Sequence, residues 1–299
     1  MRKTKPWFAM AAILCVPMPA AAAQGASPPA AAIVGVVKDA CAALPPAPAE
    51  VTEFMKRALL AKARGEAVPT PSAEGVGIYS RWQEQLKLAD HAGLCRYRAA
   101  NAALSPAGPG RVVFIGDSIT EYWLRESPAF FARGERVDRG ISGQTSAQML
   151  GRFQADVIAL KPSIVHILAG TNDIAGNGGP TNIPAIGDNI RSMVELARAH
   201  GIGVVLATLP PARRFDWRPG IDPRADIAAL NTWIRAYAQS AGLTLADYHV
   251  ALDDGDGGLS AADAADGVHP TAAGYARMEA VGDKALADAD RQRRAGASR

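Results

Sequence analysis

Residues 112–123 read Val-Val-Phe-Ile-Gly-Asp-Ser-Ile-Thr-Glu-Tyr-Trp, an apolar run followed at once by Gly-Asp-Ser. The run Val112–Ile115 has no polar alternation, which is typical of a strand that is buried on both faces of a parallel sheet. Ser118 follows this predicted strand and leads into a predicted helix. It is therefore placed to expose its hydroxyl at the edge of the sheet, unless it only caps the helix.

Short apolar runs alternate with amphipathic stretches along the rest of the chain. We predict further strands at 136–138, 163–169, 203–208 and 243–246, and helices at 146–160, 183–200, 224–240 and after Pro270. Such alternation predicts an α/β domain with a five-stranded parallel sheet and helices on both faces. Because ligands of these sheets bind at the carboxyl ends of the strands, the residues just after each strand are the candidates for a site.

Three further segments carry polar residues or glycines at such places. They are Gly140-Ile-Ser-Gly143, Gly170-Thr-Asn-Asp173 and Asp266-Gly-Val-His269. Taken singly, each has an ordinary structural explanation: a strand-to-helix turn, an asparagine that caps a turn, and a histidine on the surface. Taken together with Ser118, they supply a complete set of groups for nucleophilic chemistry.

The chemistry that these groups fit is attack by a serine. A serine hydroxyl needs a base, and the base needs an acceptor on its other ring nitrogen. Asp266 and His269 are three residues apart, so the carboxylate can reach Nδ1 and leave Nε2 for Ser118. The N–H groups of Ser118 and Gly143 and the side chain of Asn172 can donate to an oxyanion.

The four segments resemble, in order, the sequence blocks of the SGNH/GDSL hydrolase family over roughly residues 111–287. The stretches 112–123 and 166–177 carry most of the resemblance. Leu209-Pro210 and residues 217–220 look like bacterial members that are similar to platelet-activating-factor acetylhydrolase subunits. The resemblance implies a flavodoxin-like three-layer α/β/α sandwich and no metal or cofactor.

The resemblance also assigns roles to residues. It implies a catalytic triad of Ser118, Asp266 and His269 and an oxyanion hole formed by Ser118, Gly143 and Asn172. Two positions depart from the pattern. Ile119 replaces the leucine of the motif, and Asp138 stands where many relatives have asparagine, which affects hydrogen bonding below the oxyanion loop.

The activity that the resemblance implies is hydrolysis of carboxylic esters through an acyl-enzyme on Ser118. The chain lacks a long apolar lid segment, so we expect a short acyl group, acetyl above all, on a small-molecule or glycan ester. The alternatives are a lysophospholipase or thioesterase on the same triad, and a non-catalytic carbohydrate-binding protein. A nucleotide-binding domain is disfavoured, because Gly116-Asp-Ser-Ile-Thr lacks the glycines of a phosphate loop. The candidates for substrate contact are Asp117, Asp173, Arg213 and Trp217; the alternative for Trp217 is packing on the domain.

The N-terminal residues 1–23 have the features of a cleavable secretory signal. Three basic residues precede an apolar stretch at 7–18, and small residues at 21–23 precede Gln24. We therefore expect export to the periplasm or the medium, without a stable membrane anchor. The domain boundaries predicted after the signal are an Ala/Pro-rich linker at 24–50, a helical extension at 51–108 with helices at 52–67 and 82–104, the hydrolase domain at 109–290 and a disordered tail at 291–299.

The charge of the chain gives no reason to expect nucleic-acid binding. The formal net charge is +3, and residues 1–23 carry three basic and no acidic residues, so the mature chain is near 3 − 3 = 0. Cys41 and Cys95 remain after cleavage. They form either one disulfide or two separate thiols.

Overall fold

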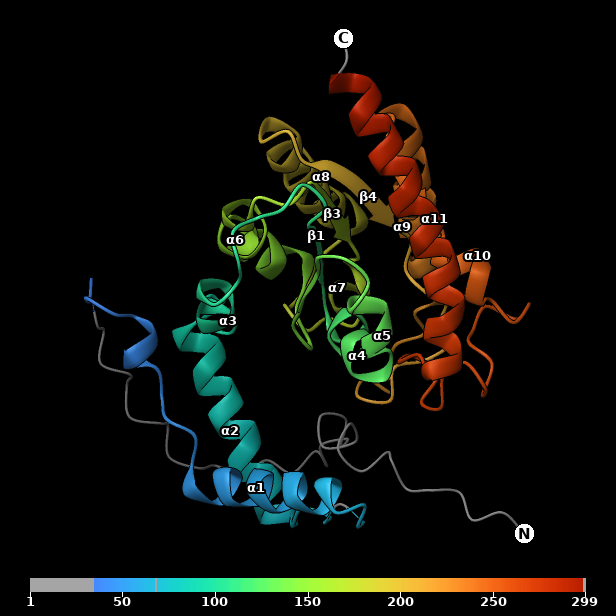
Figure 1. Cartoon of the computed structure of the whole chain (residues 1–299). Helices are drawn as coiled ribbons and strands as arrows, with labels where there is room; N and C mark the ends of the chain where they lie inside the picture. The colour runs from blue at the N-terminus through green and yellow to red at the C-terminus, as the bar shows by residue number, and fades with distance from the viewer. Residues whose placement is uncertain (1–34, 68, 298–299) are drawn as a thin grey trace. The chain divides into compact units, whose positions relative to one another are not determined.

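The structure is a computed structural model that describes residues 35–67 and 69–297. The described residues fall into two compact units, which divide between His91 and Ala92 (Figure 1). The predicted signal at 1–23 and the first part of the predicted linker lie outside the described residues. Of the helices in the described part of the chain, none combines the length and the apolar character that a membrane span requires.

The smaller unit contains two helices that follow a short 3-10 turn at Cys41–Ala43. They are α1 at Ala49–Ala63 and α2 at Ala73–Ala89. Ser72 caps α2, because its hydroxyl oxygen accepts a hydrogen bond from the Gly75 N–H at 3.0 Å. Trp82 donates from Nε1 to the carbonyl of Pro45 at 3.0 Å, which fastens α2 to the segment before α1.

The single helix predicted at 82–104 is wrong, because the structure has two helices there. After α2 ends, the short helix α3 covers Arg98–Ala102. Between them Gly93 has φ +71, a left-handed conformation that interrupts an α-helix and that glycine adopts without a steric penalty. Cys41 and Cys95 are each disulfide-bonded, so neither is a free thiol.

The larger unit is built on a five-stranded parallel sheet, and this confirms the predicted fold class. The strands are β1 (Val112–Gly116), β2 (Arg136–Gly140), β3 (Ile164–Ile167), β4 (Gly203–Ala207) and β5 (Thr244–Ala246). Their order is β2-β1-β3-β4-β5, and every neighbouring pair is parallel. This is the order of flavodoxin-like doubly wound sheets.

Helices flank this sheet in two layers (Figure 1). In one layer α6 packs on α8 and α8 on α9, and in the other α11 packs on α4 and α10. The bounds of the larger helices are α4 (Ser118–Glu126), α6 (Ser146–Asp156), α8 (Ile183–Ala199), α9 (Arg224–Ser240) and α11 (Ala272–Ala297). The short elements are α5 (Pro128–Phe131), a 3-10 turn (Ile158–Leu160), α7 (Thr171–Ile174) and α10 (Tyr248–Leu252).

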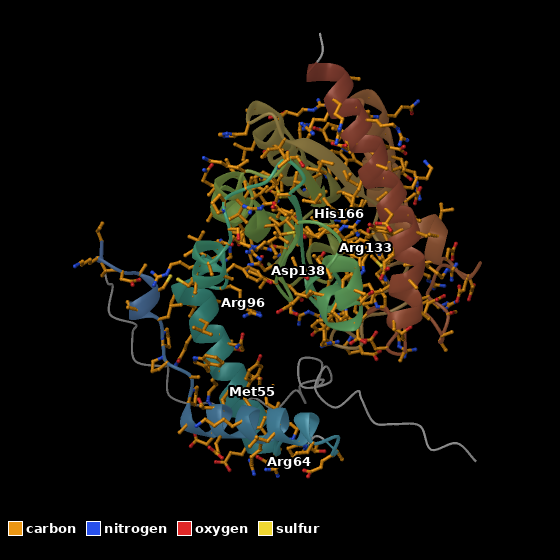
Figure 2. All side chains as sticks on the ribbon, viewed as in Figure 1. Met55, Arg64, Arg96, Arg133, Asp138 and His166 are labelled. Carbon is orange, nitrogen blue, oxygen red and sulfur yellow. The ribbon has the colours of Figure 1, made fainter. Side chains whose placement is uncertain are left out.

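An aromatic cluster around Phe114 of β1 fills the space between the sheet and α4. The ring centroid of Phe114 lies 5.7 Å from that of Trp123, 5.6 Å from Phe130 and 4.9 Å from His166. His166 lies inside the larger unit (Figure 2) and is fully buried, and its Nε2 is 2.8 Å from the hydroxyl of Tyr248. Burial lowers the pKa of His166 to about 3, so this histidine is a neutral core residue.

The disordered tail predicted from residue 291 is wrong as far as residue 297, where α11 ends. Ion pairs one turn apart support this last part of the helix. Asp290 accepts from Arg293 at 3.0 Å and from Arg294 at 2.7 Å. Such pairs stabilise an exposed helix by a few tenths of a kcal/mol each, about 0.2–0.5, and the composition alone does not show them.

Asp138 in β2 is a buried carboxyl group with an incomplete set of partners. Its Oδ1 accepts from the Gly140 N–H at 2.7 Å, and no group in the described residues bonds to its Oδ2. Burial, together with the nearby carboxylate of Glu121, raises the pKa of Asp138 to about 7 against the opposing Gly140 hydrogen bond. Figure 2 shows this residue in the interior of the larger unit.

We predict that Asp138→Asn raises stability at pH 8 and that the gain fades as the pH falls. The native pKa lies above the usual value of 3.8, so the folded chain binds the extra proton between about pH 4 and pH 7. Below this window the native Asp138 carboxyl group is neutral, and its contribution to stability is fully present. As the pH rises through 7 the buried group ionises and that contribution is lost, whereas asparagine stays neutral at every pH. We expect a gain on the order of 2 kcal/mol at pH 8 and little at pH 4 in thermal and urea unfolding.

The matched control for this substitution is Asp222→Asn. Asp222 is an exposed carboxylate whose pKa the neighbouring Arg224 lowers to about 2. This variant should gain nothing at pH 8. An Asp138→Asn gain that is equal at pH 4 and pH 8 would show that the buried charge is not the cause.

Candidate active site

The first strand, β1, delivers Ser118 to the edge of the sheet through a tight turn. Asp117 caps α4 by accepting the Ile119 N–H at 2.9 Å, and Ser118 is the first residue of that helix. The end of β2 approaches this turn so closely that a Cβ on Gly140 would lie 2.1 Å from the backbone nitrogen of Glu121. Glycine at 140 is therefore what lets β2 and the start of α4 lie side by side.

Ser118, His269 and Asp266 lie in one hydrogen-bonded chain, although Ser118 is far from the other two in sequence. The Oγ of Ser118 is 2.8 Å from Nε2 of His269, and the Nδ1 of His269 is 2.7 Å from Oδ2 of Asp266. His269 precedes Pro270 and α11, the helix that packs against α4. The imidazole is thus held between a hydroxyl and a carboxylate, which is the arrangement that activates a serine.

The carboxylate of Asp266 is held in its charged form. Its burial alone would raise the pKa, but the hydrogen bond and charge of His269 and the backbone N–H groups of Val268 and His269 outweigh burial and lower it to about 2. The two N–H groups bond to Oδ1 at 2.9 Å and 2.8 Å. Asp266 therefore accepts from the histidine at neutral pH and fixes which ring nitrogen carries the proton.

The two other candidate oxyanion donors lie in the segments that follow β2 and β3, the strands on either side of β1. Gly143 follows β2 and has φ +79, a conformation that favours glycine. Asn172 follows β3 on α7, is 3% exposed, and donates from Nδ2 to Oδ2 of Asp117 at 3.1 Å. Ser118, as the first residue of α4, has a backbone N–H without an acceptor inside its helix. The structure therefore brings the predicted residues Ser118, Gly143 and Asn172 to one edge of the sheet.

Two of the residues proposed for substrate contact are buried instead. Asp117 is 1% exposed and Asp173 is 6% exposed. The carboxylate of Asp173 accepts from the N–H and hydroxyl of Ser146 at 2.8 Å and 2.6 Å, which anchors the start of α6. Burial raises the pKa of Asp117 to about 6 against its hydrogen bond from Ile119. This placement argues against substrate contact by either residue and gives both a supporting role.

Of the other two residues proposed for substrate contact, Arg213 is bonded to acidic side chains, whereas Trp217 lies near the candidate base. Arg213 binds Asp254 through two short hydrogen bonds and Asp256 at 3.3 Å, so its charge is already paired. Trp217 stacks on Phe215 with ring centroids 4.9 Å apart, and its centroid is 6.2 Å from that of His269. Trp217 therefore lies beside the candidate base and stays a candidate for substrate contact.

Sequence reasoning missed three residues that complete the surroundings of the site. Tyr122, one turn after Ser118, has its ring centroid 5.1 Å from that of His269. Glu121 accepts from both the N–H and the hydroxyl of Ser142, next to Gly143. Asn177 donates to Asn172 and to the carbonyl of Gly143. Helical spacing from Ser118 could have indicated Tyr122 and Glu121, whereas Asn177 stands in a glycine-rich loop that carries no periodic signal.

The described residues contain no group of three or more His, Cys, Asp or Glu side chains arranged to hold a metal ion. The arrangement can thus supply a nucleophile, a base, an orienting acid and hydrogen-bond donors for an anion.

Known proteins share this arrangement of elements. The family model described as GDSL-like lipase/acylhydrolase matches residues 114–277. The solved structure of a GDSL-like lipase from Bacteroides thetaiotaomicron is similar at 43% identity and a TM-score of 0.64, covering 66% of this chain and 98% of that chain.

Two curated proteins are also similar to this chain. Esterase TesA of Pseudomonas aeruginosa is 32% identical over 146 residues, which are 48% of this chain and 64% of TesA. The uncharacterized lipoprotein YqeF of Bacillus subtilis is 37% identical over 78 residues, which are 25% of this chain and 32% of that protein. The chain therefore spans less than two thirds of the length of either curated relative.

Proposed function

Because the chain belongs to the GDSL-like lipase/acylhydrolase family, whose members hydrolyse carboxylic esters, we propose that it is an exported serine esterase that acts through an acyl-enzyme on Ser118. The observation that carries this proposal is the unbroken contact from Asp266 through His269 to Ser118. A chain that only bound carbohydrate would have no use for a hydroxyl, an imidazole and an ionised carboxylate in this order. The preferred ester has a short acyl group, acetyl above all.

In the first half of the reaction, Ser118 Oγ attacks the carbonyl carbon of the ester. His269 Nε2, 2.8 Å away, takes the hydroxyl proton, and Asp266 stabilises the imidazolium that forms. When the tetrahedral intermediate collapses, the ester C–O bond breaks and His269 gives its proton to the leaving alcohol. The products of this half are the free alcohol and Ser118 carrying the acyl group.

In the second half, water replaces the alcohol. His269 takes a proton from the water as its oxygen attacks the acyl carbon, and the acid leaves when Ser118 regains its proton. Both tetrahedral intermediates carry negative charge on the former carbonyl oxygen. The N–H groups of Ser118 and Gly143 and the amide of Asn172 stabilise that oxygen, and each such donor typically contributes a factor of about 10² to 10³ in rate.

The preference for a short acyl group rests on the side chains close to Ser118 and His269 and on the lack of a lid segment in the sequence. The sequence contains no long apolar lid, and aromatic rings of Tyr122 and Trp217 stand beside His269. Large aromatic side chains close to the base favour a compact acyl group or the ring of an alcohol over a long flexible chain. We therefore place acetyl esters of small molecules or glycans ahead of lysophospholipids and thioesters.

Export is supported by the basic and apolar pattern of residues 1–23. The similarity to a Bacillus subtilis protein named as a lipoprotein points in the same direction. The disulfide-bonded state of Cys41 and Cys95 suits an oxidising compartment.

Replacing the nucleophile tests the proposal directly. Ser118→Ala should lower the kcat for p-nitrophenyl acetate by at least about 10⁴-fold, because alanine has no oxygen that could carry the acyl group. A fluorophosphonate should label the wild-type chain once, at Ser118, as measured by peptide mass spectrometry. The control is Ser192→Ala, which removes an exposed hydroxyl bonded to the Asp188 carbonyl and should leave both readouts unchanged. Full turnover by Ser118→Ala would refute the assignment.

A panel of acyl chain lengths tests the substrate preference. The kcat/KM for p-nitrophenyl esters should be highest with acetate and should fall at least about tenfold by octanoate. Acetylated xylan should be deacetylated faster than lysophosphatidylcholine or an acyl thioester is cleaved. A maximum at octanoate, or faster cleavage of lysophosphatidylcholine, would replace the acetyl-ester proposal by the lysophospholipase alternative.

Export is tested by the N-terminus of the mature protein. When the full chain is produced in a Gram-negative host, Edman sequencing of the periplasmic fraction should begin at Gln24. Replacing Arg2, Lys3 and Lys5 by glutamate should keep the chain in the cytoplasm with its signal attached, since the positive start is required for targeting. A wild-type chain that stays cytoplasmic with an intact N-terminus would remove export from the proposal.

A further inference from the structure

The loop between α7 and α8 carries Asn177, whose side chain is bonded to two candidate oxyanion donors. These are Asn172 and Gly143, which follow strands β3 and β2 and are called the strand-end oxyanion donors below. Its Nδ2 donates to Oδ1 of Asn172 at 2.6 Å and to the backbone carbonyl of Gly143 at 3.3 Å. Its backbone N–H also donates to the carbonyl of Asn172 at 3.0 Å. The half-buried side chain of Asn177 thus connects Gly143, which follows β2, to Asn172, which follows β3. These two residues are far apart in the sequence.

These bonds leave the amide of Asn172 a single orientation. A carboxylate oxygen accepts hydrogen bonds, so the Nδ2 of Asn172 must face Asp117, to which it donates at 3.1 Å. The opposite end of the amide, Oδ1, is occupied by Asn177. Because a primary amide is planar, fixing its oxygen and one N–H proton also fixes the direction of the second N–H proton. That second proton is the one left for a substrate oxyanion.

The N–H of Gly143 is held in a similar way from both sides. The N–H and hydroxyl of Ser142 donate to Glu121, which fixes the peptide before the one that carries the Gly143 N–H. Asn177 bonds to the Gly143 carbonyl, which fixes the peptide after it. The left-handed backbone of Gly143 at φ +79 is thereby kept in place at a residue that has no side chain to pack.

We propose that Asn177 is a positioning residue that aligns both strand-end oxyanion donors, Asn172 and Gly143, before substrate arrives. This inference rests on the proposed esterase function, because it assigns a role within that reaction. Donors that are already aligned need no reorganisation as negative charge develops on the substrate oxygen, so alignment lowers the barrier and leaves ground-state binding largely unchanged. The expected signature is a loss in kcat with a nearly constant KM.

The loop that carries Asn177 is itself fastened to neighbouring segments. Arg218 donates from Nε to the carbonyl of Ala175 at 3.1 Å. At the other end, a Cβ on Gly178 would come within 3.0 Å of the Thr145 side chain, so the loop lies directly on the segment before α6. Replacing the Asn177 side chain should therefore change the hydrogen bonds to the donors and not the path of the loop.

The test is a double-mutant cycle on p-nitrophenyl acetate hydrolysis. Asn177→Ala should lower kcat about tenfold or more while KM stays within about twofold. Asn172→Ala should lower kcat by about 10² to 10³. In the Asn172→Ala background, Asn177→Ala should cost no more than about threefold, because only its effect through Gly143 is left.

A second substitution separates hydrogen bonding from side-chain volume. Asn177→Asp keeps the shape but offers carboxylate oxygens to two acceptors, so its kcat should fall at least as far as that of Asn177→Ala. If the alanine variant does not fold, the aspartate variant and Asn177→Ser carry the measurement. Asn182→Ala is the matched control: it removes the cap of α8, which accepts from Ala185 at 2.9 Å, and should lower the melting temperature without lowering kcat.

Three results would overturn the inference. They are a wild-type kcat in all Asn177 variants, a change confined to KM, and an equal loss in both Asn172 backgrounds. Each of these would leave the esterase proposal intact, because wild-type activity and its loss in Ser118→Ala do not depend on Asn177. A wild-type chain without any ester hydrolysis would overturn both proposals together.

Discussion

The parallel pairing of β1 with β2 on one side and β3 on the other is the constraint on which the candidate site depends. The register sets Gly116 of β1 level with Gly140 of β2, and Ile115 of β1 level with Ile167 of β3. Because parallel strands end at the same edge, the segments that follow them must lie close together. A shift of one residue in either pairing would turn each side chain of the shifted strand to the other face and separate Ser118 from its partners.

Polar side chains below the site hold these strand ends in place. Arg152 is fully buried and donates to the Gly116 carbonyl at 3.0 Å, to Gln144 at 2.6 Å and to Asp156 at 3.0 Å. A buried guanidinium is tolerated only when it is paired and hydrogen-bonded, so this set has little freedom to rearrange. It connects the end of β1 to α6 and to the loop of Gly143. Closer to the candidate site, Glu121 and Asn177 also hold the loop of Gly143 by hydrogen bonds.

Local patterns were enough to predict the parts of the site that depend on local geometry. Four largely apolar runs and the short piece at 136–138 predicted the five strands, since a strand buried on both faces needs few polar residues. The three-residue spacing of Asp266 and His269 predicted their contact, because one short turn joins them. The boundaries that failed depend on single residues: Gly93 with its positive φ divides the helix predicted at 82–104, and ion pairs of Asp290 extend the last helix beyond the predicted end.

The sequence by itself determined the fold class, and it indicated the candidate catalytic residues and the segments that carry them. Only the tertiary structure decided which polar residues near the site face inward to support it. Asp117 and Asp173 stand beside candidate catalytic residues in the sequence, yet both are buried, and Asn177 reaches Gly143 from 34 positions away. The physical reason is that hydrogen bonds between loops of different strands depend on the packing of the sheet and its helices, and no periodicity within one segment contains that information.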